Sequence, residues 1–293
     1  MESITLNAYA KINLGLDIVG RLPNGYHTVD MVMNQVELHD TVTVEKSDTG
    51  FSMDMVVESD NNQILDLPCD DTNLCIKAAK AILEYANIET GVKIHLIKRI
   101  PVSAGMAGGS TDAAAVLSGI NQLYNLDLTV EQLCDIGVKI GADVPYCIVG
   151  GTMRAEGIGE VLSELPALPP VDILIAKPPV GVNTKLAYQQ FDSIDDPYHP
   201  NIQELVKKLV DKNSIHDLIS YMSNSFEQFI IPERPEIADI KNIMSDNGSL
   251  LSLMTGSGPT VIGFYDNADA LNRSYEAVKA SHLAADIVIS TTR

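Results

Sequence analysis

Hydrophobic and polar residues alternate along the first 60 residues of the chain, and this period of two indicates strands. The alternation is clearest from Val32 to Val36 and from Thr41 to Val44. The segment PNGYH at residues 23–27 combines a proline with Asn-Gly and predicts a turn. We therefore expect residues 1–60 to form strands joined by turns.

The pattern changes to a helical period over residues 72–86, with Thr72 as the expected N-cap. One face of this predicted helix is apolar and carries Leu74, Ala78, Ile82 and Tyr85. Residues 92–100 predict a strand that Pro101 ends. A glycine-rich segment follows, and a second amphipathic helix is predicted over residues 112–126.

Thr129 and Gln132 have the spacing of a capping box, which predicts the start of a helix over residues 130–140 that Gly141 ends. The segment LPALPP interrupts the pattern between residues 160 and 170, so we place a domain boundary there and expect domains 1–163 and 164–293. The remaining residues predict a strand at 171–177, several helices between 184 and 246, a helix at 268–281 and a strand at 285–290. Helices and strands without regular βαβ repetition favour an α+β fold with two lobes.

The composition narrows the possible partners. Hydrophobic residues make up 45% of the chain, enough for a sizeable core, and the formal net charge is −19. Such a charge disfavours binding to nucleic acid and to anionic membranes, because both need basic patches. The four cysteines contain no CxxC pair, and we expect free thiols in a reducing compartment. The N-terminus has no basic stretch followed by an apolar run, so a cytoplasmic protein is expected.

The glycine-rich segment PVSAGMAGGSTD lies between a predicted strand and a predicted helix. Glycines let the backbone approach a ligand closely, and free amides at a helix N-terminus bind phosphate. A phosphate site of this kind needs no basic surface, which suits an acidic chain. The spacing fits neither GxxxxGK[ST] nor GxGxxG, so neither a P-loop nor a dinucleotide site is predicted. The alternative is an ordinary glycine turn followed by helix capping.

The glycine-rich segment resembles the second signature of the GHMP kinases, a proline and short spacer before Gly-Leu-Gly-Ser-Ser-Ala-Ala. Met106 stands where leucine is usual, Ala107 and an extra glycine follow, and Thr111 replaces the second serine. Three further segments match one branch of that superfamily in the right order. They are AYAKINLGLDIVGRLPNGYHTVDMVM at 8–33, GADVPYCIVGGTMRAEGIGE at 141–160 and MTGSGPTVIG at 254–263.

This branch phosphorylates a cytidine diphosphate ester in the non-mevalonate route to isoprenoid precursors. The resemblance implies transfer of the γ-phosphoryl group of ATP, with Mg²⁺, to the tertiary 2-hydroxyl of 4-diphosphocytidyl-2-C-methyl-D-erythritol. It also implies an N-terminal nucleotide-binding domain and a C-terminal ferredoxin-like α/β sandwich, with the active site between them. The implied ATP contacts are the glycine-rich residues Pro101, Val102, Ser103, Ala104, Gly105, Met106, Ala107, Gly108, Gly109, Ser110, Thr111 and Asp112, together with Asn73 and Lys98.

The resemblance makes Asp143 the catalytic base and places Lys11 beside it, where the lysine would favour the ionised carboxylate and offset charge on the transferred phosphoryl group. From the residues alone, Asp143 precedes Val144 and Pro145 and reads as a turn aspartate in a non-helical bend. Lys11 alone reads as a lysine on an edge strand. Asn13 lies two residues on, on the same face of the strand, and is an expected substrate contact.

The resemblance assigns cytidine recognition to the turn at 23–27, where Tyr26 would stack on the base and His27 would hydrogen-bond its edge. Tyr188 or Phe191 could supply the second wall. The turn of Thr255, Gly256, Ser257 and Gly258 is expected to shape the site near the substrate's diphosphate. Ser110 and Thr111 could help to hold the magnesium ion.

Three alternatives remain open on the sequence. The first is another GHMP small-molecule kinase of the homoserine or mevalonate type, and the second is a diphosphomevalonate decarboxylase on a related fold. Both lack the AKINL and GYH segments present here. The third is a nucleotide-binding sensor without catalysis, which would have no need to keep Lys11 and Asp143. The oligomeric state stays open.

Overall fold

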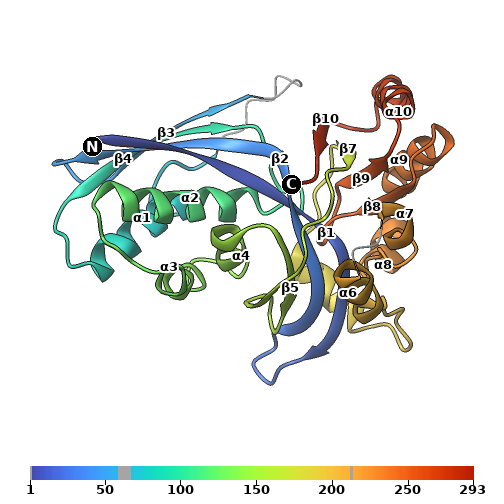
Figure 1. The fold of residues 1–293 in the computed structure, drawn as a ribbon, viewed down its shortest axis with the longest axis horizontal. Helices are drawn as coiled ribbons and strands as arrows, with labels where there is room; N and C mark the ends of the chain where they lie inside the picture. The colour runs from blue at the N-terminus through green and yellow to red at the C-terminus, as the bar shows by residue number, and fades with distance from the viewer. Residues whose placement is uncertain (1, 59–66, 212–213) are drawn as a thin grey trace. The chain divides into compact units, whose positions relative to one another are not determined.

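A computed structural model describes residues 2–58, 67–211 and 214–293, which form two compact units (Figure 1). Unit 1 comprises residues 1–10, 38–100 and 107–150, and unit 2 comprises residues 11–37, 101–106 and 151–293. Each unit is therefore built from separate stretches of chain. The long strands β1 (Ser3–Arg21) and β2 (His27–Ser47) each contribute residues to both units.

Unit 1 is a sheet covered by helices. Its strands are the first part of β1, the second half of β2, β4 (Gly91–Lys98) and β3 (Ser52–Val57). Strand β1 pairs with β2, and β4 is antiparallel to β2 and parallel to β3. Helices α1 (Leu74–Tyr85) and α2 (Gly108–Leu123) pack against each other on one face of the sheet (Figure 1). Helices α3 (Val130–Gly137) and α4 (Val144–Val149) complete this layer. The core between the layers is apolar and includes Val42, Ile82, Val92, Ile94, Val116 and Ile120.

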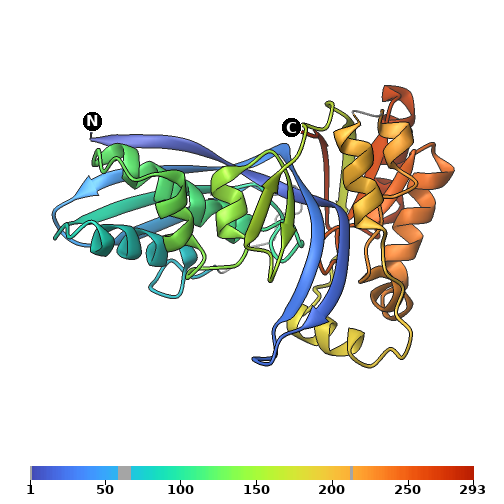
Figure 2. The same cartoon turned by 60° about the horizontal axis from the view of Figure 1, so that its bottom comes forward.

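Unit 2 has a four-stranded antiparallel sheet of β7 (Asp172–Lys177), β8 (Leu251–Met254), β9 (Val261–Tyr265) and β10 (Asp286–Thr291). The strand order is β10-β7-β9-β8, and helices separate β7 from β8 and β9 from β10. This is the βαββαβ arrangement of a ferredoxin-like fold. Helices α9 (Pro235–Asp246) and α10 (Ala268–Ser281) contact the sheet and lie on one side of it (Figures 1 and 2).

In the rest of unit 2, the first half of β2 pairs with β5 (Thr152–Glu156). Strand β5 in turn pairs with β6 (Val161–Glu164). The remaining helices are α5 (Thr184–Phe191), α6 (Ile202–Val210), α7 (Ile215–Leu218) and α8 (Glu227–Glu233). The mixture of helices and strands confirms the expected α+β class. Within the described residues, no helix is long and apolar enough to cross a bilayer, and the four cysteines are free.

Most predicted elements are present, and their ends differ for local reasons. The turn at 23–27 joins β1 to β2, with Gly25 at a φ of 89°. Helix α1 begins one residue later than predicted, because Asn73 is its N-cap: the Asn73 side chain accepts a hydrogen bond from the Cys75 amide. The hydroxyl of Thr72, the predicted cap, instead donates to Asp70. The capping box of Thr129 and Gln132 is confirmed.

Two predicted boundaries at the glycine-rich segment are wrong. Strand β4 ends at Lys98, because the Asp40 side chain accepts from the backbone amides of Arg99 and Ile100, which are then lost to the sheet. Helix α2 begins at Gly108, four residues before the predicted start, after a left-handed Ala107 with a φ of 57°. Helix α3 ends at Gly137, three residues before its predicted end.

Candidate active site

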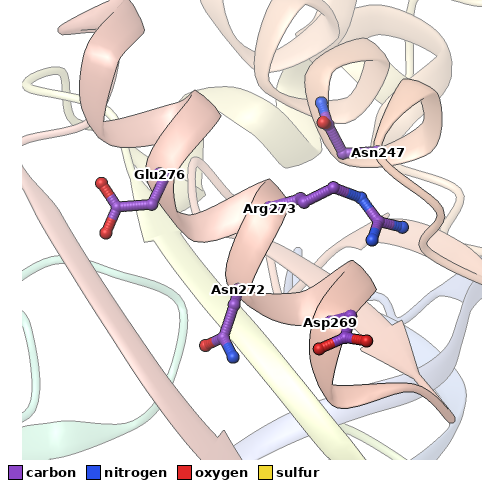
Figure 3. Close-up of a pocket in the computed structure, with 5 residues that line it drawn as sticks. All are labelled: Asn247, Asp269, Asn272, Arg273 and Glu276. Carbon is purple, nitrogen blue, oxygen red and sulfur yellow. The ribbon is translucent and has the colours of Figure 1, made fainter.

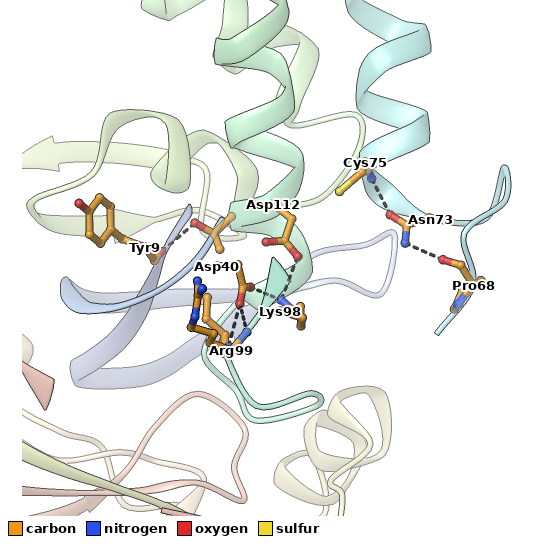
Figure 4. A network of polar contacts seen from close by, with 10 residues as sticks. Tyr9, Asp40, Pro68, Asn73, Cys75, Lys98, Arg99 and Asp112 are labelled. Carbon is orange, nitrogen blue, oxygen red and sulfur yellow. Dashed lines mark hydrogen bonds and ion pairs between the residues drawn. The ribbon is translucent and has the colours of Figure 1, made fainter. Parts of the chain in front are cut away.

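The N-terminus of α2 has the free amides that a phosphate site needs. Among the residues that the structure describes, no side chain caps the helix and its first turn carries no acidic residue. The first amide that bonds back into the turn is that of Thr111, to the Ala107 carbonyl. The amides of Gly108, Gly109 and Ser110 are thus the helix's own unpaired donors. The Thr111 side chain is buried and its hydroxyl donates to the Tyr9 carbonyl at 2.7 Å (Figure 4). That bond connects the first turn of α2 to β1. It also uses the hydroxyl proton of Thr111, which an ATP contact would need in order to donate to phosphate.

The first half of the glycine-rich segment packs against the turn at 255–258 within unit 2. A Cβ built on Gly105 would lie 2.5 Å from the Thr255 carbonyl oxygen, and one on Gly256 would lie 2.7 Å from the Gly105 carbonyl oxygen. Gly105 and Gly256 are also left-handed, with φ values of 72° and 59°. Only glycines allow two backbones to approach so closely in this conformation. The two glycine turns are therefore in close backbone contact.

Lys11 lies in a buried polar cluster in unit 2, with 5% of the residue exposed. Its ammonium donates to Asn13 Oδ1 at 2.8 Å, and the same oxygen accepts from the Gly256 amide at 3.1 Å. The Asn13 amide donates to Thr255 Oγ1 at 3.0 Å. The structure therefore brings together Lys11, Asn13, Thr255 and Gly256, four residues that the sequence singles out in two distant segments.

Asp143 is half-buried at the start of α4 in unit 1. Its backbone is helical, with φ −81° and ψ −12°, which corrects the expected non-helical bend. Pro145 lies in the first turn of α4, where a proline's missing N–H costs no helical hydrogen bond, so the helix begins directly after Asp143. The carboxylate makes no capping hydrogen bond to the helix, which leaves it available to other partners.

His27 and Tyr188 stack on each other, with ring centroids 4.7 Å apart and an interplanar angle of 14°. Of the two residues expected for the second wall, Tyr188 thus lies against His27, whereas Phe191 packs edge-on against His199 and Phe229. His27 Nε2 lies 2.7 Å from Asp192 Oδ1, and Arg21 pairs with the other carboxylate oxygen at 3.0 Å. Tyr26 is 61% exposed at the hairpin tip, so one aromatic face is free for stacking.

Asn73 and Lys98, the other two predicted ATP contacts, both have partners within the protein. Asn73 caps α1, and its amide nitrogen also donates to the Pro68 carbonyl at 2.7 Å (Figure 4). The Lys98 ammonium lies between the carboxylates of Asp40 and Asp112. Asp112, predicted as part of the phosphate loop, is 2% exposed.

A surface hollow of about 560 Å³ lies over α10 in unit 2. Its lining is polar and of mixed charge, and comprises Asn247, Asp269, Asn272, Arg273 and Glu276 (Figure 3). None of the predicted site residues lines this hollow. A binding site usually combines apolar walls with a few polar groups, and this lining lacks the walls.

Comparisons with known proteins agree with this geometry. The chain matches the GHMP kinases N terminal domain over residues 73–151 and the GHMP kinases C terminal domain over residues 202–284. A 4-diphosphocytidyl-2-C-methyl-D-erythritol kinase of Lachnoclostridium phytofermentans is 43% identical over 279 residues, which are 95% of this chain and 94% of the relative. The enzyme of the same name from Acetivibrio thermocellus is 44% identical over 281 residues, 96% of each chain.

The chain belongs to the 4-diphosphocytidyl-2-C-methyl-D-erythritol kinase family of the GHMP kinases. A crystal structure of 4-(cytidine 5'-diphospho)-2C-methyl-D-erythritol kinase has the same fold, with a TM-score of 0.81, 30% identity and 99% of each chain covered. Membership of this kinase family confirms the resemblance and the expected fold. It disfavours the homoserine and mevalonate types, the decarboxylase and the sensor without catalysis.

Three further residues contact members of the candidate site and were not predicted from the sequence. Asp40 and Asp192 hold Lys98 and His27, and Asn224 holds the 255–258 turn by donating to the Met254 and Gly256 carbonyls at 2.7 and 2.8 Å. Each lies far in sequence from the residue it holds. One signal was available for Asp192, since it follows the predicted aromatic pair Tyr188 and Phe191 in an amphipathic helix.

Proposed function

We propose that this protein transfers the γ-phosphoryl group of ATP to the 2-hydroxyl of 4-diphosphocytidyl-2-C-methyl-D-erythritol, in the non-mevalonate route to isoprenoid precursors. The observation that carries the proposal is the family match at 43% identity over 95% of the chain. The free amides of α2, the Lys11 cluster and the stacked pair of His27 and Tyr188 support it.

In the proposed reaction, the substrate's hydroxyl oxygen attacks the γ-phosphorus of ATP, and a new P–O bond forms as the bond to the β–γ bridging oxygen breaks. ADP leaves with the electron pair of the broken bond. Asp143 accepts the hydroxyl proton, and its carboxylate has no helix-capping bond that would compete for it. Lys11 offsets negative charge on the transferred group, oriented by its hydrogen bond to Asn13.

The amides of Gly108, Gly109 and Ser110 would hold the ATP phosphates. Magnesium, when bound, would neutralise phosphate charge. The described residues contain no cluster of three His, Cys, Asp or Glu that could hold the ion alone. A donor set of ATP phosphate oxygens, water and the Ser110 hydroxyl fits the residues present, since Mg²⁺ prefers oxygen ligands and keeps several waters. Thr111 would take a smaller part, because its hydroxyl donates to Tyr9.

Tyr26 would stack on the cytosine while His27 reads its edge, and Tyr188, stacked on the His27 ring, would hold that ring in place. Stacking of a base on an aromatic side chain contributes about 1–3 kcal/mol.

The net charge of −19 disfavours binding to nucleic acid, because the phosphate backbone needs basic residues. The four free thiols suit the reducing cytoplasm.

An ADP-release assay tests this proposal with four acceptors: the cytidine diphosphate ester, its uridine counterpart, homoserine and mevalonate. We expect release with the cytidine ester and at least tenfold slower release with each of the others. ADP release with mevalonate or homoserine alone would assign the chain to another GHMP activity. No release with any acceptor, despite ATP binding measured by calorimetry, would indicate a sensor.

The variant Asp143→Asn tests the base. It is expected to bind ATP within about threefold of the wild type and to lose at least about 10²-fold in kcat, the lower range for removal of a general base. The change Glu131→Gln, at an exposed position in the first turn of α3, serves as the control. Wild-type turnover by Asp143→Asn would remove Asp143 from the mechanism.

A further inference from the structure

Three charged side chains meet in the interior of unit 1. Asp40 comes from β2, Lys98 from the end of β4 and Asp112 from the second turn of α2 (Figure 4). They are 0%, 5% and 2% exposed. The Lys98 ammonium pairs with Asp40 Oδ2 and, at 2.9 Å, with Asp112 Oδ2. We refer to these three residues as the Lys98 triad.

The triad is attached to the backbone at both ends of the glycine-rich segment. On the strand side, Asp40 Oδ1 accepts from the amides of Arg99 and Ile100, the latter at 2.8 Å. On the helix side, the Lys98 ammonium lies against the first residue of α2: a Cβ added to Gly108 would be 2.7 Å from Lys98 Nζ. The triad therefore fixes the end of β4 relative to the first turn of α2.

The position of Lys98 is unfavourable without its partners. The N-terminus of a helix carries partial positive charge and repels a cation placed beside it. Burial by itself lowers the pKa of Lys98, but the charges of Asp112 and Asp40 and their hydrogen bonds outweigh it and raise that pKa. Lys98 therefore stays charged where a lone ammonium would be expelled, and its charge is directed at the two carboxyl groups.

We propose that Lys98 and Asp112 are not phosphate ligands but form, with Asp40, a positioning triad that holds the first turn of α2 so that its free amides face the nucleotide phosphates. This inference rests on the proposed function, because it takes the first turn of α2 as the phosphate site. It assigns a role to Asp40 and replaces the ATP contacts expected for Lys98 and Asp112.

The charge of the triad agrees with this role. Burial raises the pKa of Asp112 to about 8, the opposing charge of Lys98 notwithstanding. Within the described part of the chain Asp112 Oδ1 has no hydrogen-bond partner, which suits a protonated carboxyl better than a carboxylate. A triad of one ammonium, one carboxylate and one carboxylic acid is neutral, so it leaves the attraction between the α2 amides and phosphate undiminished.

The two acidic side chains of the triad differ in the partners that they keep when Lys98 is replaced, and this difference provides the test. In Lys98→Met, Asp40 still accepts two backbone hydrogen bonds, whereas Asp112 loses its 2.9 Å ion pair with Lys98 and stays buried. A positioning role predicts that the double variant Lys98→Met/Asp112→Asn recovers what the single variant loses, because an asparagine amide can donate to the Asp40 carboxylate at any pH, whereas Asp112 can do so only while it is protonated. A lysine that binds phosphate directly could not be replaced in this way.

Calorimetric Kd values for ATP, with kcat and KM for both substrates, measure the effect on the full chain. Lys98→Met is expected to weaken ATP binding at least tenfold and leave KM for the cytidine substrate within twofold. The double variant is expected to recover at least fivefold of that loss. Asp40→Asn, which keeps the size of the side chain, is expected to weaken ATP binding about tenfold and serves if Lys98→Met does not fold.

Lys93→Met is the matched control, since Lys93 is exposed on the same strand β4. ATP affinity within twofold of the wild type in both Lys98→Met and Asp40→Asn, with only a lower melting temperature, would make the triad purely structural and overturn the proposal. So would a double variant as weak as Lys98→Met, since that result makes Lys98 a phosphate ligand. A wild-type protein that binds no ATP would instead refute the proposed function.

Discussion

At the scale of single residues, the hydrogen bond between His27 and Asp192 decides what the imidazole ring can recognise. A carboxylate only accepts, so Nε2 of His27 must carry the proton of their 2.7 Å bond. A neutral ring then presents Nδ1 as an acceptor. Cytosine carries an amino donor at the position where uracil carries a carbonyl, so this acceptor favours cytosine.

We expect Asp192→Asn to lower the preference for the cytidine ester over its uridine counterpart by about tenfold, since the asparagine amide no longer enforces one tautomer. A tenfold change corresponds to about 1.4 kcal/mol, the scale of one hydrogen bond. The ratio of kcat/KM values for the two esters measures it, and Asp195→Asn, an exposed neighbour, is the control. An unchanged ratio would exclude Asp192 from base recognition.

Asp112 makes stability depend on pH. Its pKa rises from the ordinary 3.8 to about 8 through burial, so the folded protein holds a proton that the unfolded chain releases. This stabilising contribution is fully present below about pH 4 and is lost as the pH rises through about 8. Between pH 6 and 8, the wild type should lose up to about 1.4 kcal/mol per pH unit relative to Asp112→Asn. Urea unfolding of both proteins measures this, and parallel pH curves would contradict it.

At the scale of elements, the contact between the two glycine turns fixes the glycine-rich segment. Gly105→Ala places a Cβ 2.5 Å from the Thr255 carbonyl oxygen in a left-handed conformation. We expect a loss of at least about 2 kcal/mol in unfolding free energy, since the conformation alone costs about 1–2 kcal/mol. Gly181→Ala, with no atom within 4 Å of the new Cβ, should leave stability unchanged or slightly raised. Equal melting temperatures for the two variants would refute this account.

Hydrophobic periodicity predicted most of the elements, including α10 with both of its ends and β7 within one residue. It failed where a distant side chain or an unusual backbone decides the boundary. Asp40 ends β4 from another strand, and the left-handed Ala107 lets two glycines enter α2, although glycine is a poor helix former. Neither cause is visible in the local pattern.

The candidate site likewise combines residues that could be predicted from the sequence with residues that could not. Lys11, Asn13 and the 255–258 turn could be named from motifs, and the structure brings them together. The residues that hold parts of the site could not be predicted. Asn224, Asp40 and Asp192 are common polar residues, and their partners depend on which strand or turn they face. The burial of Asp112 within the 101–112 segment could not be predicted either, since nothing in the local sequence pattern shows that its side chain faces inward.

At the scale of the whole molecule, the two compact units do not correspond to the two halves of the sequence. The boundary expected at 163/164 would separate β7–β10 from residues 11–37, which belong to the same unit. Leu16 exchanges two backbone hydrogen bonds with Ser223 and Ser225, and Asn13 bonds with Thr255 and Gly256. Removal of residues 1–163 takes these partners away from the Ser223 carbonyl, the Ser225 amide, the Thr255 hydroxyl and the Gly256 amide.

A fragment of residues 164–293 is therefore expected to show no cooperative thermal transition by circular dichroism, whereas co-expression with residues 1–163 should restore one. The cost arises from the lost hydrogen bonds and from the apolar side chains of unit 2 that Ile12, Leu14 and Ile18 would otherwise help to exclude from water. A fragment that melts cooperatively by itself would support the boundary at 163/164.

The chain order of unit 2 also governs its synthesis. Leu16 leaves the ribosome early, but its partners Ser223 and Ser225 follow more than 200 residues later. At about 5–20 residues per second, this interval is on the order of 10–40 s. During this interval, the apolar second half of β1 lacks its partners in unit 2, whereas residues of unit 1 can already assemble. The nascent chain thus exposes the apolar second half of β1 before its partners in unit 2 have been synthesised, and a holding chaperone or rapid pairing with β2 would protect it.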